Sequence, residues 1–134
     1  MEHPLRLNGQ HPAVDFTNYE RISGVTTVAV NVTPGLAKRL LERNTRNRKI
    51  SEKVVLKYVE EIRAGDWKLT PSGIGFDSSG VLIDGQHRLA AVAKSGLAAP
   101  MLITLGLPTA SQEKVDRQRR RTLFDALYLS GNAY

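Results

Sequence analysis

The sequence predicts a small α/β (α+β) domain in which a mixed sheet is flanked by helices. Three observations support this prediction: a run of β-branched residues leads directly into a helix, two short strands are joined by a turn, and a strand, a glycine, a helix and another strand follow in succession. The chain has 134 residues, of which 41% are hydrophobic and 24% are charged. This size and composition indicate one globular domain with its own core.

The first part of the chain is expected to contain an arm, a strand and a helix. Residues 1–24 mix Pro, Gly, Asn and His with isolated apolar side chains, which is typical of an irregular arm. Residues 25–32 are rich in β-branched side chains and predict a strand. Thr33 and Pro34 have the residue types of an N-cap and a first helical position, so we expect a helix that runs through Leu41.

An exposed loop and a second helix are expected next. Residues 43–49 carry four cations and two amides and no apolar side chain, which is typical of a loop between helices. Ser51 and Glu52 have the residue types of a helix start, and Gly65 stands where a glycine would end the helix. Five apolar residues between these limits share one stripe at helical spacing, and we expect this stripe to face the core.

The centre of the chain predicts short strands and a hairpin. We expect strands at residues 67–69, 73–76 and 81–83, and a turn at residues 77–80 that joins the last two strands. Trp67 is expected to pack in the core, with stacking on a nucleobase as the alternative.

The last part of the chain predicts a helix, a strand and a final helix. We expect the first helix over residues 86–94, the strand over residues 100–105, and a last helix that Thr122 caps and that runs through Leu129. We therefore expect one domain over residues 25–134. Because the sequence ends soon after the last predicted helix, a truncation of the C-terminal helical part of the domain is left open.

Charge and cysteine content restrict the classes of function. Nineteen basic and 13 acidic side chains give a net charge of +6, which makes contact with a polyanion such as nucleic acid easy. The chain has no cysteine, which excludes disulfides, thiolate metal sites and cysteine nucleophiles. No apolar segment resembles a signal peptide or a membrane span, so we expect a cytoplasmic protein without a membrane partner.

The segment with the most chemistry is Asp84-Gly85-Gln86-His87-Arg88, referred to below as the box. A strand passes through a glycine into a helix there, and helix N-termini attract anions through their free N–H groups and dipole. His87 and Arg88 would add donors to a bound phosphate. Asp84 would either cap the helix or bind Mg²⁺. The alternative for the whole box is an ordinary polar helix start, with Arg88 paired to a carboxylate.

The box resembles the Gly-Glu-Arg-Arg box of ParB-family amino-terminal domains and, more closely, the Gly-Cys-His-Arg box of sulfiredoxin. It is most similar to "DGQHR"-type proteins of the same superfamily, which are common in actinobacteria and their phages. The similarity covers residues 25–129 and includes further short matches in the same order: Asn44, Asn47-Arg48, Gly65-Asp66-Trp67, Phe76-Asp77, Ser95-Gly96 and Asp116 to Thr122.

The resemblance implies a bound nucleoside triphosphate, CTP or ATP, with its phosphates over Gly85, Gln86, His87 and Arg88. The phosphate role carries over cleanly for Gly85 and Arg88 only, because Gln86 and His87 differ from the ParB residues. Sulfiredoxin activity is excluded, since its nucleophile is a cysteine. Asn47 and Arg48, with Asn44, are expected to complete the nucleotide site, whereas the alternative is a solvated loop.

The expected function is therefore a nucleotide-binding, ParB-like domain in DNA-associated regulation. Whether the chain is an enzyme stays open; the alternative is a Mg²⁺-dependent NTPase or phosphotransferase with Asp84 as the catalytic carboxylate and Mg²⁺ ligand. A ParB-like nuclease ranks last, because clustered carboxylates for two metals are missing from the sequence. A homodimer is left open. DNA binding would use the densest group of cations, for which a solvated segment is the alternative: Arg117, Arg119, Arg120 and Arg121.

Overall fold

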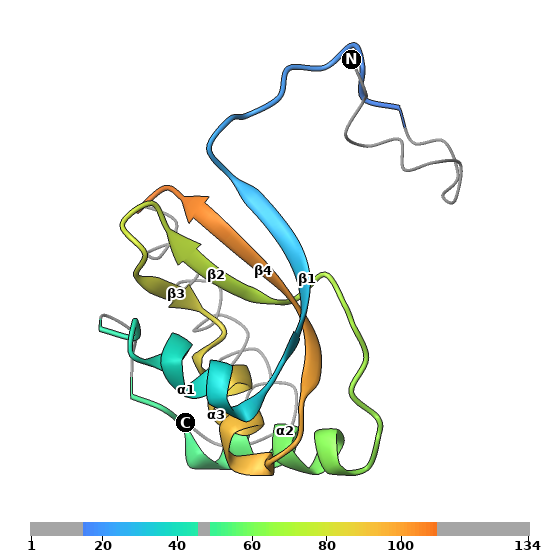
Figure 1. Cartoon of the computed structure of the whole chain (residues 1–134), viewed down its shortest axis with the longest axis vertical. Coiled ribbons are helices and arrows are strands. Elements are labelled where there is room, and N and C mark those ends of the chain that lie inside the picture. Colours follow the sequence, from blue (N-terminus) through green and yellow to red (C-terminus); the bar gives the residue numbers. More distant parts are fainter. Residues whose placement is uncertain (1–14, 46–48, 110–134) are drawn as a thin grey trace, which may run out of the picture.

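The computed structural model describes residues 15–45 and 49–109 and confirms the predicted class. Within these residues, a four-stranded mixed sheet is covered by three helices (Figure 1). The strand order is β1-β4-β2-β3, with β2 parallel to β4 and the other neighbours antiparallel. The elements in chain order are β1 (Thr26–Val32), α1 (Pro34–Leu41), α2 (Glu52–Arg63), β2 (Ile74–Asp77), β3 (Leu82–Asp84), α3 (Gln86–Ser95) and β4 (Ala99–Leu107).

The first two helices begin where their capping residues predict. The Thr33 hydroxyl accepts a hydrogen bond from the Leu36 amide at 3.2 Å, and the Ser51 hydroxyl accepts one from the Val54 amide at 3.4 Å. Each hydroxyl satisfies an N–H group that has no partner inside the helix. Gly65 follows the end of α2 with φ of 76°, a conformation that favours glycine.

The predicted hairpin is also confirmed. Strands β2 and β3 pair in antiparallel fashion, and one carboxylate oxygen of Asp77 accepts hydrogen bonds from the amides of Ser79 (2.8 Å) and Val81 (2.9 Å). Asp77 is buried, with 3% of its surface exposed. Its carboxylate therefore holds the turn that the sequence predicts at residues 77–80.

The predicted strand at residues 67–69 is wrong. These residues form a coil between α2 and β2. The Trp67 indole donates a hydrogen bond to the Pro100 carbonyl at 3.0 Å and lies edge-to-face on the Tyr58 ring, with 5.5 Å between ring centres. Side-chain contacts to α2 and β4 hold this segment in place of a strand ladder, and Trp67 packs against the core as expected.

The core lies between the helices and one face of the sheet. Ala99, Met101 and Ile103 alternate along β4 and are nearly inaccessible, as expected for a strand with one buried face. The core residues of α2 and α3 face them and include Val55, Val59, Ile62, Leu89 and Val92. In the part of the chain that the structure describes, no helix has the length and apolar character needed to cross a membrane.

Candidate functional site

The box connects strand β3 to helix α3 through a buried glycine. Gly85 has φ of 97°, and a Cβ atom there would lie 2.5 Å from Ile74 Cδ1 and 3.0 Å from the Gly73 carbonyl oxygen. Both the backbone conformation and the lack of space therefore require glycine. Gly85 is the N-cap of α3 and, having no side chain, makes no side-chain capping bond.

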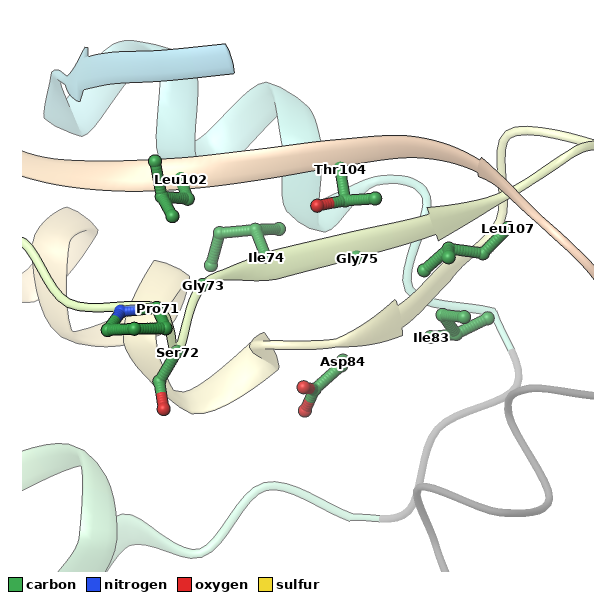
Figure 2. Close-up of a pocket in the computed structure, with 10 residues that line it drawn as sticks. All are labelled: Pro71, Ser72, Gly73, Ile74, Gly75, Ile83, Asp84, Leu102, Thr104 and Leu107. Atoms are coloured by element: carbon green, nitrogen blue, oxygen red, sulfur yellow. The ribbon is translucent and has the colours of Figure 1, made fainter. Parts of the chain in front are cut away.

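The capping role considered for Asp84 is wrong. Asp84 is the last residue of β3, and the helix begins one residue beyond Gly85, so the N-cap position belongs to the glycine. Figure 2 shows the Asp84 carboxylate and the Ser72 hydroxyl pointing to the same side of the β2–β3 pair. Among the described residues, no group of three or more His, Cys, Asp or Glu side chains has metal-binding geometry.

Gln86, the first residue of α3, is almost completely buried, with 1% of its surface exposed. Its side-chain oxygen accepts a hydrogen bond from the side-chain nitrogen Nδ2 of Asn44 at 2.9 Å. Its side-chain nitrogen has no hydrogen-bond partner among the described residues. Asn44, which the sequence assigned to the site, therefore does lie beside the box.

His87 connects α3 to the start of α2. Its Nε2 atom accepts a hydrogen bond from the Ser51 amide at 2.9 Å. A ring nitrogen that accepts from a backbone N–H carries no proton, so this contact requires the neutral imidazole with its proton on Nδ1. The same Ser51 caps α2 through its hydroxyl, so one residue joins both helix starts.

Arg88 connects α3 to the start of β2. One guanidinium nitrogen donates to the Gly73 carbonyl at 3.0 Å, and the guanidinium carbon lies 5.9 Å from the centre of the Tyr58 ring. A cation above an aromatic face is an attractive arrangement. Among the described residues, Arg88 thus contacts a carbonyl and a ring, and not the carboxylate partner considered as an alternative.

Three successive side chains of the box therefore reach three separate segments of the chain. Gln86 contacts the loop after α1, His87 the start of α2, and Arg88 the start of β2. The sequence does not predict these contacts, because the partners are 15 to 42 positions away. Their consequence is that the first turn of α3 has a fixed position relative to the rest of the fold.

A small open pocket of about 190 Å³ lies next to the box, on the side of Asp84 (Figure 2). Sequence reasoning missed it, although two closely spaced glycines at positions 73 and 75 were a usable signal for a hollow or a close approach. Its lining is largely apolar: Pro71, Ser72, Gly73, Ile74, Gly75, Ile83, Asp84, Leu102, Thr104 and Leu107.

Several predicted site residues lie outside the described residues. These are Asn47 and Arg48 of the basic loop, and the cations assigned to nucleic-acid binding: Arg117, Arg119, Arg120 and Arg121. Of the remaining loop cations, Arg43 and Lys49 are exposed, in agreement with a solvated surface. The Arg43 carbonyl accepts a hydrogen bond from the Leu82 amide at 2.9 Å, which places the loop beside β3.

Comparison of the chain with models of protein families, with curated proteins and with solved structures gave no match. The likeness to ParB-family domains and to sulfiredoxin therefore rests on the motifs of the sequence.

Proposed function

We propose that the chain binds the phosphates of a nucleoside triphosphate at the start of α3 and acts as a nucleotide-binding, ParB-like domain in DNA-associated regulation. The observation that carries the proposal is the start of α3 itself: it is buried, it begins after a glycine, and that glycine offers no side-chain cap. Helix N–H groups in this situation are strong sites for an anion, because they combine free donors with the positive end of the dipole.

The buried amide of Gln86 supports the same proposal. Its side-chain nitrogen is a donor at the first position of the helix and has no acceptor among the described residues. Leaving a buried donor without an acceptor costs about 1 to 3 kcal/mol. A phosphate oxygen at the start of α3 would supply an acceptor and remove this cost.

The backbone would do more of the binding than the side chains. His87 and Arg88 each use one hydrogen-bonding atom to hold another segment. Arg88 keeps further N–H donors for a phosphate, since a guanidinium carries five.

DNA is the second partner in this proposal. Its support is the net charge of +6 and the cations Arg117, Arg119, Arg120 and Arg121 of the sequence. Contacts to DNA phosphates release counterions, so the affinity for duplex DNA should fall steeply with salt, and replacing these arginines should flatten that dependence.

The alternative function is a Mg²⁺-dependent NTPase or phosphotransferase. The observation in its favour is the place of Asp84: it ends β3, one residue before the Gly85 N-cap, so its carboxylate lies beside the start of α3. Mg²⁺ is commonly held by one or two carboxylates together with substrate phosphates, and Asp84 would fit as such a ligand. Nucleotide-dependent release of phosphate that is lost in Asp84→Asn would favour this enzyme over a binding domain.

Calorimetric titration of the full chain tests the proposed site. ATP, CTP, GTP and UTP are titrated separately, each with and without Mg²⁺, into the wild type, Arg88→Ala and Lys94→Ala. Lys94→Ala is the matched control, because it removes one cation from the exposed last turn of the same helix, where Lys94 pairs with Glu52. Thermal melting of each variant shows whether it remains folded.

We expect saturable binding of at least one nucleotide. Arg88→Ala should weaken it about tenfold or more, the effect of one charge-assisted contact, and Lys94→Ala should leave it nearly unchanged. Absence of heat with all four nucleotides would contradict the proposal, as would equal losses in the two variants.

A further inference from the structure

We propose that the outer edge of β1 is an interface at which two copies of this chain pair, strand to strand, into one continuous sheet. The sheet order β1-β4-β2-β3 leaves β1 and β3 at its edges. An edge strand presents unpaired N–H and C=O groups to any further strand, and proteins usually protect such edges. The two edges of this sheet differ in that protection.

The β3 edge is protected. Strand β3 has three residues, its pairing with β2 shifts register, and the Leu82 amide on this edge donates to the Arg43 carbonyl at 2.9 Å. A short strand, an irregularity and a covering segment are three known means of preventing edge-to-edge pairing. No additional strand is expected on this side of the sheet.

Within the described residues, the β1 edge has none of these features. Strand β1 has seven residues, pairs with β4 without a shift of register, and is exposed over its first four residues. Its residues, Thr26–Val32, include no charged side chain and no proline. Among the described residues, its backbone hydrogen bonds reach β4 and no other segment.

The geometry of β4 identifies which groups of β1 point outward. The Leu102 carbonyl points toward β2, since a Cβ atom on Gly73 would lie 2.2 Å from its oxygen. Ala29 is opposite Leu102, and in an antiparallel pair such residues both direct their N–H and C=O groups away from each other. The residues of β1 with outward backbone groups are therefore Thr27, Ala29 and Asn31.

A second copy fits this edge because the strand is complementary to itself. A two-fold antiparallel pairing that uses all seven residues is centred on Ala29, where the two smallest side chains of the strand would meet. It places Thr27 opposite Asn31 on the face away from the helices, and Val28 opposite Val30 on the other face. Val28 is 45% exposed in the single chain and would gain an apolar neighbour. The pairing brings no like charges together. An acidic peptide is a poorer partner for this edge, because β1 has no cation to attract it.

The oligomeric state of the full chain tests this interface. Light scattering after size-exclusion chromatography, over concentrations up to the high micromolar range, is compared for wild type, Ala29→Lys and Leu56→Lys. The first variant places a charge at the two-fold centre. The second is the control, because it removes an apolar side chain that is 44% exposed on α2, away from the sheet edge. We expect dimers for the wild type and for Leu56→Lys, and a folded monomer for Ala29→Lys. Its melting temperature should match that of the wild type only at low concentration, where the wild-type dimer dissociates.

Oxidative crosslinking tests the register without relying on a charged substitution. The chain has no cysteine, so a single cysteine introduced by Ala29→Cys can pair only with its copy. Hydrogen-bonded antiparallel partners have Cα atoms about 5.5 Å apart, which lies within the range of about 4.4 to 6.8 Å that a disulfide spans. We expect rapid crosslinking in Ala29→Cys and slow crosslinking in Thr27→Cys and Leu56→Cys.

Three results would overturn the proposal. They are a monomeric wild type at every concentration, a dimer that persists in Ala29→Lys, and crosslinking in Leu56→Cys as fast as in Ala29→Cys.

Discussion

The hydroxyl groups of Thr33 and Ser51 cap the first turns of α1 and α2, whereas α3 begins after Gly85, which has no side chain. The surroundings differ as well, because Thr33 and Ser51 are exposed and Gly85 and Gln86 are buried. Exposed helix starts can satisfy their N–H groups with a local hydroxyl or with water. A buried start has neither source, so its donors need either another part of the chain or a ligand.

This contrast separates two roles for the residue at a helix start. At α1 and α2 the residue stabilises the helix. At α3 the glycine allows the start of β2 to pack closely against the start of the helix: the space that a Cβ atom would need is occupied by Ile74 and by the Gly73 carbonyl. The helix is instead held by the side chains of Gln86, His87 and Arg88, which reach outward to other segments.

The largest effect is expected from Gly85→Ala. The substitution combines an unfavourable left-handed backbone with a contact of 2.5 Å to Ile74 Cδ1. We expect a loss of about 3 kcal/mol or more in the free energy of unfolding, from backbone strain and overpacking together. Urea denaturation measures it. Gly96→Ala is the control, because Gly96 has a similar φ of 75° with no atom within 4 Å of an added Cβ, and it should cost about 1 to 2 kcal/mol. Equal losses would show that the space at Gly85 is unimportant.

A smaller effect on stability is expected at the contact between His87, in the first turn of α3, and Ser51, the N-cap of α2. His87→Phe removes the acceptor of the Ser51 amide and should lower the free energy of unfolding by about 1 to 2 kcal/mol. His87→Gln offers a side-chain oxygen in a similar position and should recover part of the loss. If both variants have the same midpoint of urea unfolding as the wild type, the contact between His87 and Ser51 does not stabilise the packing of α2 against α3.

Removal of a cap should have a similar or slightly smaller effect. Thr33→Ala leaves the Leu36 amide without its acceptor and should cost about 1 kcal/mol. Nucleotide affinity should not change, because Thr33 lies at the start of α1. A changed affinity, measured by calorimetry under the same conditions, would mean that the caps and the proposed phosphate site are coupled.

The smallest effect on stability is expected from Gln86→Met. The variant loses the hydrogen bond from Asn44 but also removes the buried nitrogen that has no acceptor, so the two changes nearly cancel. We expect a change of less than about 1 kcal/mol in the free energy of unfolding. Nucleotide binding should nonetheless weaken, because a donor at the site is lost. Unchanged nucleotide affinity would remove Gln86 from the proposed site.

The sequence predicted those parts of the fold that depend on neighbouring residues. The starts of α1 and α2, the turn at Asp77 and the strand, glycine and helix of the box all follow from capping residues, turn residues and apolar periodicity. Each of these signals acts over a few positions. The cap of α3 was misplaced by one residue, because Asp and Gly are both acceptable N-cap types. The left-handed backbone at position 85 and the packing against Ile74 select the glycine.

The parts that could not be predicted depend on distant contacts. The strand order places β1 next to β4, far away in the sequence, and periodicity carries no information about such pairing. Trp67 has the composition of a strand around it, but its contacts with Tyr58 and Pro100 hold it in a coil. The contacts of Gln86, His87 and Arg88 are of the same distant kind. The sequence therefore located the box, and the structure shows which of its side chains also hold the fold together.

The most direct test of the phosphate site compares backbone amide signals during a nucleotide titration. Two-dimensional ¹H–¹⁵N NMR spectra of the full chain are recorded as the nucleotide that gives heat in calorimetry is added. We predict saturable shifts in the amides of Gln86, His87 and Arg88. Shifts should be small for the Leu36 and Val54 amides in the first turns of α1 and α2, because hydroxyl groups already cap them. Shifts spread over exposed lysines and arginines with none at the start of α3, or no shifts at all, would contradict the account.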